Sequence, residues 1–297
     1  MYRDWWALHS GAMTGAGEQP VQWSDLVGIP SGELLMGSAM TFYPEEFPQS
    51  RVEVSAFQIG RGPVTNAQFA DFCRASGHVT VAEQGAEPGS LVFVGTPGPV
   101  ALDEWRQWWR WVPGASWRAP EGPGTTVDER ENHPVVHIAY SDALAYARWC
   151  GGDLPTEAEW EWAARGGLVG ATYAWGEEPN RGERLYANTW QGDFPFDNHG
   201  AHGWRGTSPV GEFPPNGYGL ADVTGNVWEW TRTVWAGSPG EGPCCSGAPA
   251  HDGDLKVIKG GSHLCSPQYC LRYRPAARSP QEIAASTSHI GFRICRR

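Results

Sequence analysis

Short hydrophobic runs alternate with glycine and polar residues along most of the 297-residue chain. Near the start, residues 27–38 (VGIPSGELLMGS) place apolar runs on both sides of turn-forming residues, which predicts a β-hairpin. In the following segment Val52 and Val54 alternate with charged residues, a pattern typical of a half-buried strand. Residues 255–261 (LKVIKGG) are one of several short strand-like pieces in the second half of the chain.

Three short amphipathic helices are also predicted, each from its apolar spacing and a capping residue. The first follows Thr65, and the second follows Ser141. The third follows Thr156, with Glu159 placed to complete a capping box and Gly166 placed to end the helix. Short helices in the first half and loop-bound strands in the second half indicate one α+β domain with little regular structure.

The expected organisation also includes a tryptophan-rich stretch, an N-terminal leader and one domain that follows it. Trp105, Trp108 and Trp109 have the spacing of a helical stripe, which we interpret as part of the core rather than as a cofactor site. Residues 1–24 form a polar, glycine-rich leader that we expect to be partly disordered. Residues 25–297 then form one α+β domain that is rich in loops and low in regular secondary structure.

Composition narrows the functional class. The chain has 39 glycines, 24 prolines, 17 tryptophans and a formal net charge of −11. Such an acidic chain is a poor partner for nucleic acid, whose binding depends on Lys and Arg displacing counterions. No apolar run resembles a secretory signal or reaches the roughly 18 residues of a membrane span. We therefore expect a cytoplasmic protein that does not enter a membrane.

Seven cysteines carry the candidate chemistry: Cys73, Cys150, Cys244, Cys245, Cys265, Cys270 and Cys295. In the cytoplasm most of them should be reduced. Cys244 and Cys245 lie in a loop rich in glycine and proline, where we expect ordinary or incidentally reactive thiols.

Cys265 and Cys270 differ, because polar and basic residues surround them. Nearby Arg272, Arg274 and Arg278 would lower the thiol pKa values if they faced the sulfurs. A zinc site needs a second pair of ligands, which the sequence does not offer. A redox dithiol, a Cu(I) dithiolate and two core thiols remain. The polar surroundings favour the first two, and the residues alone do not rank copper above thiol exchange.

A second candidate site lies in residues 219–230 (GLADVTGNVWEW). Asp222 and Glu229 flank a Gly-Asn turn, whose carbonyl oxygens together with carboxylates are the ligands that Ca²⁺ prefers. An ordinary turn with a solvated glutamate explains these residues equally well.

Several segments together resemble the formylglycine-generating enzymes, also called sulfatase-modifying factors. The resemblance runs from about Val27 to Arg293 and is carried by HPVVHIAYSDALAYARWCGGDLPTEAEWEWAARGG, ANTWQGDFP, FPPNGYGLADVTGNVWEWT and GGSHLCSPQYCLRYRPAAR. The cysteine-containing motif is the most specific part. The resemblance implies a single domain related to C-type lectins. It also implies an oxidoreductase that acts on a sulfur group with O₂ as acceptor, converting a cysteine in a Cys-x-Pro-x-Arg motif of unfolded sulfatases to Cα-formylglycine.

The same resemblance implies roles for individual residues. Cys265 and Cys270 would hold Cu(I), and the substrate thiolate would join them as a further ligand. Ser262 and Tyr269 match positions that flank the metal, and Trp228 matches an aromatic wall of the substrate groove.

Two structural calcium sites are implied as well. The first comprises Asp222, Val223, Gly225, Val227 and Glu229. The second comprises Asn188, Thr189 and Trp204, but His202 stands where the family has a carboxylate. Imidazole is a poor ligand for Ca²⁺, so the second site needs Asp193 or Asp197 as a substitute.

Another departure is Ala284 and Ala285, where the family has polar residues that bear on substrate choice. We expect a monomer that acts on an unfolded sulfatase polypeptide. Two alternatives stay open: a catalytically inactive lectin-like binding module, and a metal-free dithiol oxidase. The sequence does not identify the sulfatase or the physiological reductant.

Overall fold

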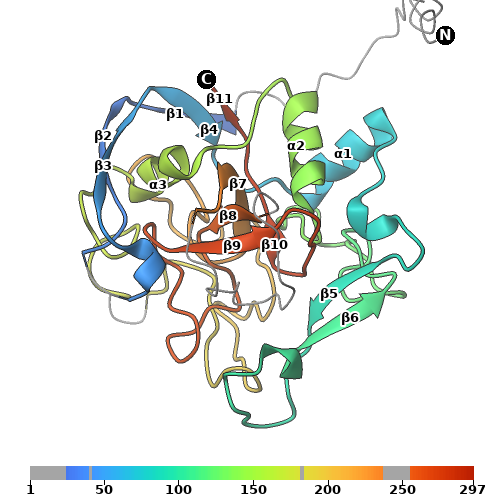
Figure 1. Ribbon diagram of the computed structural model, residues 1–297. Coiled ribbons are helices and arrows are strands. Elements are labelled where there is room, and N and C mark those ends of the chain that lie inside the picture. Colours follow the sequence, from blue (N-terminus) through green and yellow to red (C-terminus); the bar gives the residue numbers. More distant parts are fainter. Residues whose placement is uncertain (1–24, 40–41, 181–183, 237–254) are drawn as a thin grey trace, which may run out of the picture.

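The computed structural model describes residues 25–39, 42–180, 184–236 and 255–297 (Figure 1). The expected leader and the Cys244–Cys245 pair lie outside these residues. The helices are α1 (Asn66–Ser76), α2 (Tyr140–Trp149) and α3 (Glu157–Arg165). The strands are β1 (Leu26–Ile29), β2 (Gly32–Met36), β3 (Ser50–Val54), β4 (Phe57–Gly60), β5 (Gly89–Phe93), β6 (Trp109–Pro113), β7 (Trp228–Val234), β8 (Leu255–Lys259), β9 (Arg278–Glu282), β10 (Ile290–Gly291) and β11 (Cys295–Arg296).

The capping signals for α1 and α3 are confirmed. Thr65 accepts a hydrogen bond from the backbone of Gln68, whose side chain bonds back to the cap, and Thr156 makes the same box with Glu159. Gly166 ends α3 in the left-handed conformation, with φ of 57°. Each of these signals acts within four residues of the chain, so no distant partner is needed to place the helix ends.

The expected start of α2 at Ser141 is wrong. The helix begins at Tyr140, and Ala139 is its N-cap. The carboxylate of Asp142 accepts a hydrogen bond from the backbone N–H of Ala139 at 3.1 Å. The third helical residue therefore caps the helix from inside, and the Ser141 hydroxyl is not needed for that purpose.

The expected hairpin over residues 27–38 is also wrong. Strand β1 pairs with β4, whereas β2 pairs with β3, so the two apolar runs belong to different sheets. Ile29, Leu34, Phe57 and Ile59 nevertheless lie in one buried cluster. Burial of these side chains decided which strands pair. A local alternation of apolar and polar residues predicts a strand but does not specify its partner.

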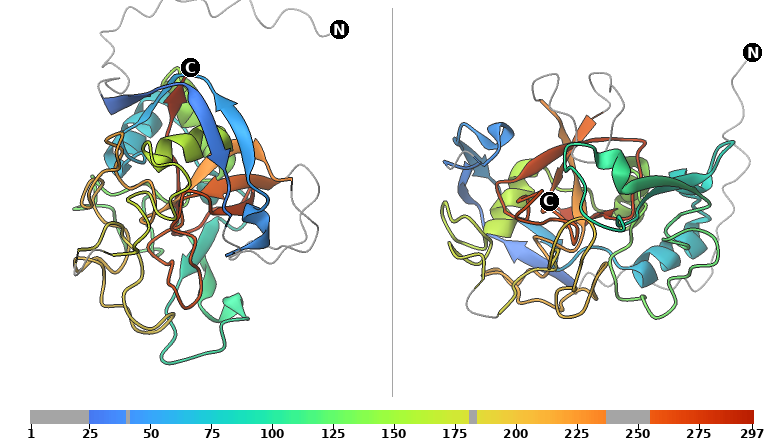
Figure 2. Two further views of the ribbon diagram at one scale, coloured as in Figure 1. Left: turned by 90° about the vertical axis from the view of Figure 1, so that its left-hand side faces the viewer. Right: turned by 90° about the horizontal axis from the view of Figure 1, so that it is seen from below.

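Four strands form the central sheet in the order β10-β7-β8-β9, with β10 parallel to β7 and the other pairs antiparallel. The β5–β6 hairpin lies on the side of the molecule opposite to β1–β4 (Figures 1 and 2). Long loops connect these elements, as the sequence predicted. Within the described ranges, no helix is long and apolar enough to cross a bilayer.

The tryptophan-rich stretch is part of the core, but its expected helical stripe is wrong. Trp105 lies in a short 3₁₀ turn, and Trp109 begins strand β6. Trp108 and Trp109 are buried in a cluster that contains Trp190, Phe194 and Leu264. The extended backbone of β6 suits this cluster because it lets Trp109 pair with Phe93 across the hairpin.

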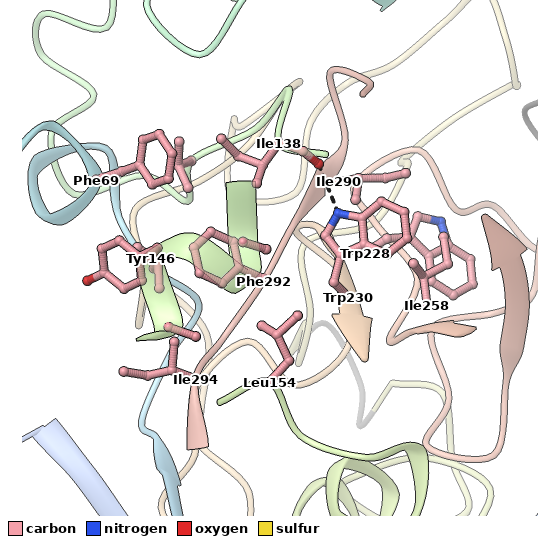
Figure 3. Packing of buried hydrophobic residues seen from close by; sticks show 14 of the residues in the cluster. Phe69, Ile138, Tyr146, Leu154, Trp228, Trp230, Ile258, Ile290, Phe292 and Ile294 are labelled. Atoms are coloured by element: carbon pink, nitrogen blue, oxygen red, sulfur yellow. Dashed lines mark hydrogen bonds between the residues drawn. The ribbon is translucent and has the colours of Figure 1, made fainter. Parts of the chain in front are cut away.

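The main core packs α1 and α2 against strands β7 and β10. Figure 3 shows Phe69, Tyr146, Phe292 and Trp230 in this cluster, with the indole Nε1 of Trp230 donating to the carbonyl of Ile138 at 2.8 Å. Cys265 and Cys270 belong to the same cluster of buried residues. The candidate site therefore lies at the edge of the core and not on a mobile surface loop.

Candidate active site

A tight turn brings the two cysteines together. The backbone N–H groups of Tyr269 and Cys270 both donate to the carbonyl of Ser266, at 3.0 and 2.7 Å, and this folds the chain back on Cys265. The two Sγ atoms are 3.2 Å apart, and the residues are 1% and 4% exposed. A disulfide bond is about 2.05 Å long, so the pair is a reduced dithiol.

The residues before Cys265 form a second turn that faces its sulfur. The backbone N–H of Ser262 points at Cys265 Sγ from 3.4 Å, and the Ser262 carbonyl accepts from the Cys265 N–H at 2.9 Å. Gly261 has φ of 70°, and a β-carbon there would lie 2.9 Å from the backbone of Arg272. Only glycine fits at this position, which explains its place directly before Ser262.

The three nearby arginines each contact a carboxylate. The pairs are Arg272 with Glu45 (2.6 Å), Arg274 with Glu46 (2.8 Å) and Arg278 with Glu157 (2.9 Å). Two of the three carboxylates come from the 3₁₀ turn Pro44–Glu46. The guanidinium groups are thus engaged by carboxylates, and they tie the cysteine-containing loop to distant parts of the chain.

Tyr43, which the sequence did not single out, lies beside the cysteine loop. Its hydroxyl accepts a hydrogen bond from the backbone N–H of Leu271 at 2.9 Å, and the guanidinium of Arg272 covers its ring at 3.8 Å. Burial raises the pKa of Tyr43, and the neighbouring Cys270 raises it further. Burial likewise raises the pKa of Tyr273. Both phenols stay protonated near neutral pH and can donate hydrogen bonds.

A small cavity adjoins the dithiol. Its volume is about 10 Å³, the room that about one water molecule needs. It is lined by Phe93, Trp108, Trp109, Phe194, Trp228, Ser262, Leu264, Cys265, Tyr269, Cys270 and His289. The structure thus brings together all five residues expected to take part in catalysis, and it adds a wall of further aromatic residues.

Tyr269 is held in that wall by ring contacts. Its ring stacks on Phe194 with centroids 4.8 Å apart and meets the edge of Trp108 at 5.3 Å. Trp228 is 1% exposed, and its backbone N–H donates to the carbonyl of His289. The cavity between these rings and the dithiol therefore has room for about one water-sized group.

The first expected calcium site has its carboxylates already in use. The guanidinium of Arg293 donates to both oxygens of Glu229, at 2.6 and 2.7 Å, and the indole of Trp160 donates to one of them at 2.7 Å. The same guanidinium donates to the carbonyl of Asp222 at 3.1 Å. Arg293 therefore supplies positive charge to these oxygens, and Glu229 does not fit the role of a calcium ligand.

Asp222 itself is buried, and its Oδ2 accepts from the backbone N–H of Gly211 at 2.7 Å. Burial is the main cause that raises the pKa of Asp222 to about 6. Val223 and Val227 are buried in the same turn. Gly225, which lies between them, has a left-handed backbone conformation.

The second expected calcium site differs from the first, because one of its buried oxygen atoms has no hydrogen-bond partner among the described residues. Asn188 is fully buried, and its Oδ1 has no hydrogen-bond partner among the described residues. Its Nδ2 donates to the carbonyl of Gly206 at 2.9 Å. An orphaned buried oxygen of this kind fits a cation or a water molecule.

The other members of the second set are less suited to calcium. Thr189 accepts from the side chain of Gln191, and the ring of Trp204 packs on His133. His202 stacks on Phe213 with ring centroids 4.7 Å apart and contacts Glu212.

The two carboxylates considered as substitutes have other partners. Asp193 accepts from Gln268 at 3.0 Å, and Asp197 contacts His199 at 3.0 Å. The set therefore lacks a carboxylate committed to it, and Asn188 is its best-suited member.

Two larger hollows follow one another, and the smaller of them adjoins the dithiol cavity. One, of about 240 Å³, shares Phe93 and Leu264 with that cavity. The next, of about 780 Å³, is lined by Glu121, Asp128 and Glu129. Glu121, Arg130 and Arg205 are the charged residues of the smaller hollow, and Arg130 also lines the larger one, where it pairs with Glu121.

The alanines that depart from the family pattern lie near strand β5. Ala284 is exposed, and Ala285 bonds through its backbone to Glu282. The next residue, Ser286, accepts hydrogen bonds from the backbone of Leu91 and the hydroxyl of Ser90. Ala284 and Ala285 therefore add no polar side chain to the segment that runs beside β5.

The donor set at Cys265 and Cys270 fits a soft cation such as Cu(I). Two thiols within 3.2 Å of each other can contact one ion, and thiolates favour soft cations such as Cu(I). Among the described residues, no group of three or more His, Cys, Asp or Glu side chains is arranged to hold a metal ion. A metal at Cys265 and Cys270 must therefore accept two protein ligands.

Comparison with known proteins agrees with this geometry. The model of the sulfatase-modifying factor enzyme 1-like domain matches residues 13–297. The chain belongs to this family. A protein of Mycobacterium tuberculosis named formylglycine-generating enzyme is 55% identical, with 91% of this chain and 97% of that protein covered.

Two further relatives show how widely the sulfatase-modifying factor fold is used. A mouse protein named inactive C-alpha-formylglycine-generating enzyme 2 is 38% identical over 90% of this chain and 84% of its own length. The structure of PvdO from Pseudomonas aeruginosa has a TM-score of 0.62 at 25% identity, covering 92% of this chain and 94% of its own. The fold is therefore that of the family, while activity depends on residues of the site.

Proposed function

We propose that this protein oxidises a cysteine of sulfatase polypeptides to Cα-formylglycine with O₂. The observation that carries the proposal is the reduced, buried pair of Cys265 and Cys270, with sulfurs 3.2 Å apart beside a cavity the size of one water molecule. The 55% identity to a protein named formylglycine-generating enzyme supports the same activity.

The two thiolates would hold Cu(I), which when bound supplies the activation of O₂. A cytoplasmic location, where thiols stay reduced, would suit the pair. In the overall reaction R-CH₂SH, O₂, two electrons and two protons give R-CHO, H₂S and H₂O. Because O₂ takes up four electrons and the substrate gives two, an external reductant such as a thiol must supply the other two.

The protein residues around the pair have defined tasks in this proposal. Trp228 and Tyr269 exclude bulk water and leave the substrate thiol one narrow approach. Ser262 and Tyr269 line the cavity. Their hydroxyls would donate hydrogen bonds to the oxygen atoms of O₂ as it is reduced. Burial of the pair also protects it from exchange with other thiols.

The substrate would be an unfolded segment with the Cys-x-Pro-x-Arg motif. A cysteine inside a packed strand cannot reach sulfurs that are 1% and 4% exposed. The larger hollow is lined by Asp128 and Glu129 as well as by the Glu121–Arg130 ion pair, and its two further carboxylates would attract the arginine of the motif. Ala284 and Ala285 would tune substrate choice by leaving their edge apolar.

A structural Ca²⁺ ion is proposed at Asn188, whose unpaired Oδ1 needs a partner. This reverses the order expected from the sequence, because Arg293 already engages the carboxylate of Glu229. Carbonyl and amide oxygens with water would complete the coordination.

One experiment separates the oxidase from its alternatives. Reduced protein is given a Cys-x-Pro-x-Arg peptide and a thiol reductant in air, with copper or after copper removal, and the peptide mass is followed. The proposal is supported if, only with copper, the peptide mass shows that the SH group and one hydrogen of its cysteine have been replaced by oxygen. Conversion without copper would support the dithiol oxidase, and binding without conversion would support a lectin-like module.

A further inference from the structure

The dithiol is closed off from solvent by the wall of its cavity. Cys265 and Cys270 are 1% and 4% exposed, and the cavity beside them has a volume of about 10 Å³. The residues that line it are buried except for Phe93 and Tyr269, which are half-buried. A group that enters the cavity from solvent must therefore displace part of this wall, and the wall meets solvent at these two rings.

The two half-buried rings are held in different ways. Phe93 belongs to strand β5 and pairs with Trp109 across the β5–β6 hairpin, so moving it would break strand pairing. Tyr269 lies in the turn that folds back on Ser266, next to the exposed residue Gln268. Moving Tyr269 shifts only a short turn, so this is the part of the wall that yields at least cost.

Two side-chain hydrogen bonds join this turn to the segment that carries Phe194. The Oε1 of Gln268 accepts from the backbone N–H of Phe194 at 3.1 Å, and its Nε2 donates to the carboxylate of Asp193 at 3.0 Å. The rings of Phe194 and Tyr269 both line the cavity and stack with an interplanar angle of 3°. Gln268 thus ties together the two segments whose rings meet at the cavity wall.

We infer that Gln268 is a positioning residue, which holds the ring of Tyr269 against Phe194 and thereby limits the access of a thiol substrate to the dithiol. The consequence for the substrate rests on the proposed function. The amide of Gln268 is used as donor and as acceptor at once, which fixes its orientation. Each bond contributes modestly to stability, so both can break while the core stays folded.

The test measures how fast the thiols react with iodoacetamide in reduced, copper-free protein. Peptide mapping by mass reads each cysteine separately. Gln268→Ala removes both bonds and should speed the labelling of Cys265 and Cys270 about tenfold, the ratio expected when one or two hydrogen bonds no longer oppose opening.

Two controls separate access to the dithiol from a general loosening of the fold. Cys73, Cys150 and Cys295 are also buried free thiols, and none of them lines the cavity. Their labelling rates should stay unchanged in Gln268→Ala. The matched variant is Gln84→Ala, which removes a side-chain bond within another surface loop and should leave the rates of these five thiols unchanged.

A second pair of substitutions first breaks the bond to Asp193 and then restores it. In Gln268→Glu the new carboxylate faces the carboxylate of Asp193, and like charges repel, so labelling of the dithiol should speed up. Adding Asp193→Asn supplies an amide donor to the new carboxylate, and slow labelling should return. A side chain that merely fills space would show no such rescue.

Unchanged labelling of Cys265 and Cys270 in Gln268→Ala would overturn the inference. Equal acceleration at all five buried thiols would also overturn it, because the fold as a whole would then have loosened, and so would the lack of rescue by Asp193→Asn. Failure of the proposed function is recorded separately: the wild type would leave the peptide mass unchanged when copper, reductant and air are supplied, whatever the labelling rates are.

Discussion

The guanidinium of Arg274 donates to both carboxylate oxygens of Glu46, although the two residues are 228 positions apart in the chain. Both side chains are almost completely buried, at 1% and 0% exposure. The pair joins the loop that follows Cys270 to the 3₁₀ turn Pro44–Glu46. The position of the dithiol loop therefore depends on an ion pair with a residue near the start of the described chain.

Glu46→Gln should destabilise the fold by about 3 kcal/mol, because it leaves the buried guanidinium of Arg274 without a counter-charge. Urea unfolding at neutral pH measures this change. Glu33→Gln is the control, since Glu33 pairs with Arg51 on the surface and its loss should cost less than about 1 kcal/mol. Equal effects of the two substitutions would show that the Arg274–Glu46 pair does not brace the loop.

Cys265→Ser and Cys270→Ser should each abolish peptide conversion and weaken Cu(I) binding by orders of magnitude, because one thiolate does not hold the ion as two do. Copper should raise the melting temperature of the wild type and of neither variant, since a ligand of the native state stabilises it by mass action. Competition with a Cu(I) chelator and thermal scans test both points.

Cys73→Ser provides the thiol control. Cys73 is buried in the core, where burial raises the pKa of its thiol to about 11. This variant should lose some stability but keep copper affinity. If Cys265→Ser bound copper as tightly as Cys73→Ser does, the dithiol would not be the copper site.

His137 should make stability fall in mild acid. It is fully buried, its ring bonds to Ser90 and to the carbonyl of Pro120, and burial lowers its pKa to about 4. Between pH 6.5 and 4 the unfolded chain takes up a proton on this imidazole and the folded protein does not. The free energy of unfolding therefore decreases as the pH falls, by up to about 3 kcal/mol from this group.

His137→Asn should remove that part of the pH dependence. Asparagine tolerates the left-handed backbone of this position, where φ is 60°. Urea unfolding of both proteins at pH 7 and at pH 4.5 gives the comparison. The variant should be less stable at pH 7 and should approach or pass the wild type at pH 4.5. A constant difference between the proteins would contradict the assignment.

Calcium should stabilise the protein through Asn188. Asn188→Ala should remove most of the shift in melting temperature between Ca²⁺ and a chelator, because it deletes the orphaned Oδ1. Asp222→Asn should keep most of that shift, since its carboxylate already accepts from Gly211 and is not left open to the ion. The reverse result would restore the order expected from the sequence.

Replacing the arginine of the Cys-x-Pro-x-Arg peptide by alanine should lower kcat/KM about tenfold or more, and added salt should weaken binding of the arginine peptide only. The reason is the lining formed by Asp128 and Glu129 beside the Glu121–Arg130 ion pair. Turnover of both peptides at equal rates, at low and high salt, would exclude a contact between this lining and the arginine.

The sequence by itself determined the features that act over a few residues. The boxes at Thr65 and Thr156 placed two helix ends, because a side chain and a backbone N–H three residues apart are sufficient to form a cap. The motif around Cys265 and Cys270 likewise lies within one turn, so the sequence indicated a candidate thiol site but left open whether the pair exchanges thiols, holds Cu(I) or belongs to the core. Ser141 is not the cap because the helix already begins at Tyr140, where Asp142 accepts from the backbone N–H of Ala139.

Only the tertiary structure decided which distant segments meet. The pairing of β1 with β4, the partner of Arg274 and the orphaned oxygen of Asn188 all depend on burial, which a local pattern does not record. Trp109 shows the difference most clearly. Its spacing predicted a helix, but the long-range packing of β5 against β6 holds it extended, and its side chain lines the dithiol cavity. Backbone propensity is a weak force beside the burial of several aromatic rings.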